Sequence, residues 1–87
     1  MVKIAEVVAE FSAEGFSNTG KQTRGRVLRD VHAAVYFFQV DDEARGLPAP
    51  SGEHAYEDDA RTALFKYWEK CEEALKASGM PTWKPKY

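Results

Sequence analysis

Apolar side chains recur at the spacing of an α-helix in three stretches of this chain, residues 2–14, 20–44 and 53–78. A half-buried strand would instead alternate apolar and polar side chains with a period of two, and the chain shows no such run. No internal repeat or low-complexity segment interrupts the pattern. It therefore predicts three helices and no sheet.

The first predicted helix carries its apolar residues on one face. Ile4, Val7 and Phe11 follow the i, i+3, i+7 spacing, and lysine and glutamate side chains occupy the opposite face. Gly15 stands where a left-handed residue ends a helix, and Phe16 is placed to pack back on the last turn. These positions predict a short amphipathic helix.

The second predicted helix is apolar around most of its circumference. Thr19 and Gln22 have the spacing of a capping box at its start, and Gly25 weakens it by roughly 1 kcal/mol relative to alanine. Tyr36 and Phe37 lie nearly opposite its main apolar stripe. Either this helix is the central element, in contact with both neighbours, or Tyr36 and Phe37 face a second subunit or a partner protein.

The third predicted helix has clear signals at both ends. The connection before it, residues 46–52, contains two prolines and two glycines and cannot continue a helix. Acidic residues in its first turns suit the positive end of the helix dipole, and Gly79 with Pro81 stops it after Ser78. Its apolar face is made of Ala60, Leu64, Tyr67, Trp68, Cys71 and Leu75.

Together these elements predict an all-α fold in one domain, residues 1–87. The two longer helices, joined by the short proline-rich connection, should form an antiparallel hairpin, and the short first helix should pack across it. The tail, residues 79–87, is too rich in proline for a helix or a central strand, so we expect an extended segment there.

Composition narrows the class of protein. Basic and acidic side chains number 12 and 14, and a net charge of −2 argues against a generic nucleic-acid binder, which carries a basic excess. A lone cysteine excludes an internal disulfide and suits a reducing cytosol. Glu6 and Glu10 interrupt the N-terminal apolar run, so we read no secretory signal there. The uncharged stretch at residues 31–40 is about half of a membrane span. We therefore expect a soluble cytoplasmic protein.

Charge is polarised along the predicted hairpin. A basic end is formed by the first half of the second helix, with Lys21, Arg24, Arg26 and Arg29. An acidic end follows from its last turn, with Asp41, Asp42 and Glu43. The basic end is either a solvated surface or an anion site at a helix N-terminus. The acidic end is either a solvated helix end or a docking surface for a basic partner.

The chain offers little catalytic chemistry. His32 is expected beside an apolar stripe, and His54 is expected to be an exposed residue near a helix start. Cys71 falls within an apolar face, where a free cysteine packs as a small apolar residue rather than as a nucleophile. No spacing matches a zinc or calcium site or a nucleotide-binding loop, so we expect no catalytic residue, metal or cofactor.

These observations predict a non-enzymatic protein-interaction module, a small adaptor, regulator or inhibitor of the kind that bacteria and phages use. The candidate contact residues are Tyr36, Phe37, Phe65, Asp41, Asp42, Glu43, Trp83 and Tyr87. The alternative is a nucleic-acid or phosphate binder that uses the basic residues of the second helix. Homo-oligomerisation is compatible with either function, because small domains often gain stability that way.

Overall fold

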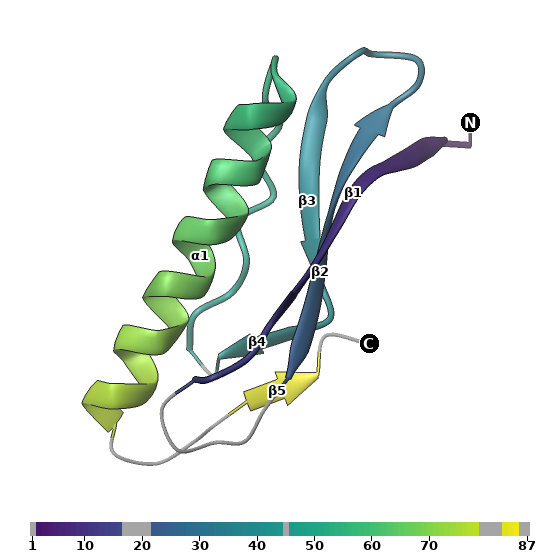
Figure 1. Ribbon diagram of the computed structural model, residues 1–87. Coiled ribbons are helices and arrows are strands. Elements are labelled where there is room, and N and C mark those ends of the chain that lie inside the picture. Colours follow the sequence, from purple (N-terminus) through teal and green to yellow (C-terminus); the bar gives the residue numbers. More distant parts are fainter. Residues whose placement is uncertain (1, 17–21, 45, 79–82, 86–87) are drawn as a thin grey trace.

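The structure, a computed structural model, describes residues 2–16, 22–44, 46–78 and 83–85. In these residues the chain forms five β-strands and one α-helix (Figure 1). The elements in chain order are β1 (Ala5–Ala13), β2 (Thr23–Asp30), β3 (Tyr36–Val40), β4 (Asp42–Ala44), α1 (Glu57–Ser78) and β5 (Trp83–Pro85). An antiparallel sheet of order β1-β2-β3 carries α1 along one face, and β4 pairs with β5 in a second, two-stranded sheet.

The all-α prediction is therefore wrong for the first half of the chain. The helix expected over 2–14 is strand β1, and the helix expected over 20–44 is replaced by β2, β3 and β4. No helical hairpin forms, so the molecule is a sheet covered by one helix rather than a bundle of three helices.

A β-bulge explains why the first strand resembled a helix. The pairing of β1 with β2 shifts between Val7 and Ala9, which leaves Val8 as the extra residue. Beyond the bulge, Ala9 and Phe11 are half-buried on the α1 side and alternate with exposed Glu10. An extra residue breaks the period of two, so the apolar residues before and after it fall at helical spacing.

The turn between β2 and β3 contains no glycine, proline or asparagine. Asp30 organises it: its Oδ1 accepts hydrogen bonds from the backbone N–H groups of His32 and Ala33 at 2.9 and 3.1 Å. Ala34 occupies the left-handed region with φ 55°, a conformation that alanine adopts rarely. The usual sequence signals of a hairpin are absent here, so the segment reads as a continuous helix.

The second predicted helix was apolar on two sides because β3 has apolar residues on both faces. Phe38 and Val40 are buried against α1, while Phe37 points to the opposite face, where it lies across from Leu28 of β2. Aromatic and β-branched residues of this kind favour strands. Period two and period 3.6 cannot be distinguished when both faces are apolar.

The third helix, predicted over 53–78, is confirmed from Glu57 to Ser78, and residues 53–56 precede it without helical structure. Its first turn is acidic, as expected from the helix dipole. All six residues of the predicted apolar face are buried and form the helix side of the core: Ala60, Leu64, Tyr67, Trp68, Cys71 and Leu75. The predicted stop signals Gly79 and Pro81 lie outside the described residues.

The connection from β4 to α1 runs back beside the sheet. Tyr67 donates a hydrogen bond from its hydroxyl to the carbonyl oxygen of Leu47 at 2.7 Å, and Tyr36 and His54 exchange two backbone hydrogen bonds of 2.7 Å. His54 is thus half-buried beside β3 rather than exposed at a helix start. The tail was expected to be extended, and its residues 83–85 form the short strand beside β4. In the part of the chain that is described, no helix is long and apolar enough to cross a membrane.

Candidate protein-binding groove

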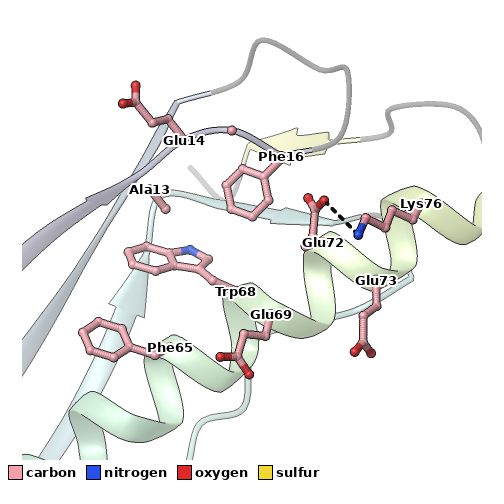
Figure 2. Close-up of a pocket in the computed structure, with 10 residues that line it drawn as sticks. Ala13, Glu14, Phe16, Phe65, Trp68, Glu69, Glu72, Glu73 and Lys76 are labelled. Carbon is pink, nitrogen blue, oxygen red and sulfur yellow. Dashed lines mark ion pairs between the residues drawn. The ribbon is translucent and has the colours of Figure 1, made fainter.

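A groove of about 730 Å³ lies between the end of β1 and the C-terminal half of α1 (Figure 2). It is open to solvent along its length and falls within the volume range of protein ligand sites, roughly 300–1,000 Å³. Ten residues line it, and we call this surface the α1–β1 groove: Ala13, Glu14, Gly15, Phe16, Phe65, Trp68, Glu69, Glu72, Glu73 and Lys76.

The chain reverses into the groove directly after β1. Gly15 has a φ of +83°, a left-handed conformation that glycine adopts without strain. The reversal turns Phe16 inward, where it is 7% exposed and belongs to the core. The sequence predicted the left-handed glycine, but it placed Phe16 on the last turn of a helix, and that helix does not form. Phe16 instead forms one wall of the groove.

Aromatic rings form the base of the groove. Phe65 and Trp68 are stacked at 6.4 Å with an interplanar angle of 18°, and Phe11 meets Phe65 edge-on at 5.0 Å. Phe65 is 39% exposed although its ring is held by these two contacts. An exposed aromatic ring fixed by its neighbours loses little conformational entropy when a partner covers it. Phe65, one of the contact residues predicted from the sequence, is such a ring.

The rim of the groove is acidic. Figure 2 shows Glu14 on the β1 side and Glu69 and Glu73 on the α1 side, all three exposed. Glu72 lies between the two sides, and its Oε1 is 4.0 Å from the Lys76 Nζ. The lining therefore carries four carboxylates and one ammonium group. A cationic ligand fits this charge pattern, because like charge would be repelled.

The indole N–H of Trp68 is an unsatisfied donor. Trp68 is 8% exposed, and its Nε1 is buried without a hydrogen-bond partner in the described part of the chain. Figure 2 shows the nitrogen-bearing edge of the indole turned toward Phe16 inside the groove. A buried donor without an acceptor costs about 1–3 kcal/mol, so a ligand acceptor at this point would remove a penalty.

The structure separates Tyr36 and Phe37, which the sequence placed together on one helix face. They are neighbours on β3 and point to opposite sides of the sheet. Tyr36 is half-buried against the core, whereas Phe37 lies on the face away from α1 with the Lys3 Nζ 4.6 Å above its ring. Neither residue lines the α1–β1 groove.

The acidic triplet is engaged within the chain. Asp42 is 8% exposed and its Oδ2 accepts a hydrogen bond from the Thr23 hydroxyl at 2.7 Å. Glu43 accepts one from the backbone N–H of Ala49 at 2.6 Å and so holds the connection to α1. Asp41, the third member, forms an ion pair with Arg26 of β2. Together the three carboxylates organise the strand ends and the connection that follows them.

The three basic candidates that lie in the described residues do not share one face of the sheet. Arg24 and Arg26 point to the side of β2 away from α1, and Arg29 points to the other side. Lys21 lies outside the described residues. Since a strand alternates its side chains, the basic surface expected from a helix is divided between two faces.

Acidic neighbours balance two of these arginines. Arg26 donates from Nη2 to the Asp41 Oδ1 at 2.9 Å, and its Nε lies 3.7 Å from the Glu10 Oε2. Arg29 donates to the Glu6 Oε1 at 2.7 Å. Carboxylates that already pair with these guanidinium groups compete with any phosphate for them.

Sequence reasoning missed most of the groove. Glu69 and Glu73 stand at i and i+4 on a helix that was predicted correctly, so their common face could have been read from the sequence. Glu14 and Phe16 could not have been placed there, because only the strand β1 brings them beside α1. Of the last two candidates, Tyr87 lies outside the described residues, and Trp83 is described only as part of the backbone pairing of β5 with β4.

The buried thiol and phenol show no sign of activation. Burial raises the pKa of the Cys71 thiol, and burial together with a hydrogen bond to Cys71 raises the pKa of Tyr67. Both side chains lie in the core. Among the described residues, no three His, Cys, Asp or Glu side chains converge as metal ligands would.

Comparison with known proteins gives no further guide to the site. No family model, no curated protein and no solved structure matches the chain. The site is therefore judged on its geometry alone.

Proposed function

We propose that the protein is a non-enzymatic interaction module that binds a basic segment of a partner protein in the α1–β1 groove. The observation that supports this most directly is the combination of an acidic rim with an exposed, fixed aromatic ring. Aromatic residues supply binding energy at protein interfaces, and complementary charge supplies specificity and a fast association rate. We expect the module to act in the cytoplasm, where its one cysteine stays reduced.

Nucleic acid fits the described surface less well. A phosphate backbone needs several cations on one face, and the two paired arginines of β2 point to opposite sides of the sheet with their charge balanced. The groove itself has an excess of carboxylates. The geometry therefore favours a basic protein partner over a polyanion.

A labelled hexa-arginine peptide tests the proposal by fluorescence anisotropy at about 0.15 M ionic strength. The variant E69Q/E73Q removes two rim charges, and the matched control D58N/D59N removes two carboxylates from the other end of the same helix. An exposed ion pair contributes up to about 1 kcal/mol, so E69Q/E73Q should weaken binding by about tenfold. D58N/D59N should leave the affinity within about twofold of the wild-type value.

Circular dichroism confirms that both variants are folded before binding is compared. Equal loss of affinity in the two variants would mean that net charge alone attracts the peptide, and the groove would not be the site. The same pair of variants serves as bait in a nuclease-treated lysate. A true partner is retained by the wild type and by D58N/D59N and is lost with E69Q/E73Q.

A further inference from the structure

The α1–β1 groove has two features in addition to its negative charge. One is the buried indole N–H of Trp68, a donor without an acceptor in the described chain. The other is the exposed ring of Phe65, stacked on Trp68 and flanked on α1 by Glu69. A hydrogen-bond acceptor on the ligand would satisfy the indole N–H, and a flat cationic group suits the ring of Phe65.

We propose that the groove recognises an arginine residue within an extended peptide: the guanidinium group lies against Phe65 and pairs with Glu69, and a main-chain carbonyl accepts the Trp68 indole N–H. This inference rests on the proposed function and names the residue that the partner must supply. One arginine residue then contacts both parts of the groove: its side chain reaches the acidic rim, and its main chain reaches the indole at the base.

The arrangement of the carboxylates favours arginine over lysine. They are spread along the rim, and no three acidic groups converge on one point among the described residues. Glu69 stands one helical turn after Phe65 on α1. A guanidinium presents five N–H donors in a plane, so it pairs with a carboxylate and stacks on the neighbouring aromatic face at once. An ammonium group is a compact point charge and does neither as well.

Phe16 stands between the open groove and the indole N–H of Trp68. The nitrogen-bearing edge of Trp68 faces Phe16, so Phe16 must move aside for a carbonyl to approach (Figure 2). Gly15 precedes it in the left-handed conformation, with φ +83°. Phe16 is a core side chain, so binding of the carbonyl displaces it from the core.

Nuclear magnetic resonance of the indole N–H gives a direct test. In the variant W83F, Trp68 is the one remaining tryptophan and gives the single indole N–H signal. Titration with hexa-arginine should move this proton signal downfield and slow its exchange with solvent, as expected when the donor gains an acceptor. Spermine carries positive charge but no carbonyl group, so it should leave the indole signal in place. Hexa-lysine should bind about tenfold more weakly than hexa-arginine.

The outcomes distinguish failure of the arginine contact from failure of the proposed function. If hexa-arginine binds through Glu69 and Glu73 while the indole signal stays unchanged, the carbonyl contact is refuted and the proposed function stands. Equal affinity for hexa-lysine overturns the preference for arginine. If hexa-arginine does not bind at all, or binds E69Q/E73Q as tightly as the wild type, both the inference and the proposed function fail.

Discussion

Gly25 lies beneath Trp68, where the core leaves no room for a side chain. Gly25 is buried in the centre of β2, opposite Phe11 of β1 and Val40 of β3. A Cβ placed on it would lie 2.8 Å from the Trp68 Cζ2 and 3.0 Å from the Leu64 Cδ1, both shorter than ordinary contacts. Replacement of Gly25 by alanine therefore forces the indole away from the sheet.

The cost of this substitution follows from two opposing effects. Overpacking of a dense core destabilises a protein by about 1–3 kcal/mol. Alanine also restricts the unfolded chain, and this stabilises by about 0.4–1 kcal/mol, because the backbone of Gly25 is not left-handed. The clash is the larger effect, so we expect G25A to lower the free energy of unfolding by about 1–2 kcal/mol. For a domain of this size that corresponds to a decrease in Tm of roughly 4–16 °C.

Urea unfolding followed by circular dichroism measures the effect, and a double-mutant cycle assigns it to Trp68. The variant W68F lacks the ring atoms that clash and leaves space above residue 25. The methyl group of G25A then fills that space, so G25A/W68F should be more stable than the sum of the single changes by about 1 kcal/mol. A wild-type stability for G25A, or additive effects within about 0.5 kcal/mol, would refute the reasoning.

Two further predictions concern titratable groups. Hydrogen bonds from the backbone N–H groups of His32 and Ala33 hold the pKa of Asp30 below its ordinary 3.8. A carboxyl group whose pKa is lower in the folded protein than in the unfolded chain stabilises the fold above the unfolded pKa, and this stability is lost as the pH falls through the folded pKa. The variant D30N should therefore be less stable than the wild type at pH 7, and the two should converge in acid. Urea unfolding between pH 7 and pH 2 measures the difference. Cys71 is fully buried and its pKa is raised, so a thiol reagent should react slowly with the native protein and rapidly in urea; rapid native labelling would contradict its place in the core.

The sequence correctly predicted what depends on local interactions. A helix is held by bonds between residues four apart, so the apolar period of residues 57–78 and the acidic first turn predict both α1 and its buried face. Glu69 and Glu73 share a face of this helix for the same reason. Gly15 is left-handed as predicted, although it follows a strand and does not end a helix.

The strands were missed because their signals are weak and their partners are distant in sequence. The bulge at Val8 interrupts the alternation of apolar and polar residues in β1. The turn after Asp30 has Ala34 in the left-handed conformation, where glycine is the usual residue. Both faces of β3 are apolar, so its pattern fits two periods. These segments become strands because they pair with one another and bury one face against α1, which local propensity does not report.

One side of the α1–β1 groove also follows from a local sequence pattern, and the other side depends on tertiary structure. Its α1 side, with Phe65 and the glutamates of the helix, follows from the period of 3.6 residues that the sequence displays. Its β1 side depends on tertiary structure alone, because only the pairing of β1 with β2 carries Glu14 and Phe16 across to the helix. By itself the sequence determined one helix and its faces. The packing of a sheet against that helix decided which residues meet, since contacts between distant segments form only when both bury apolar surface together.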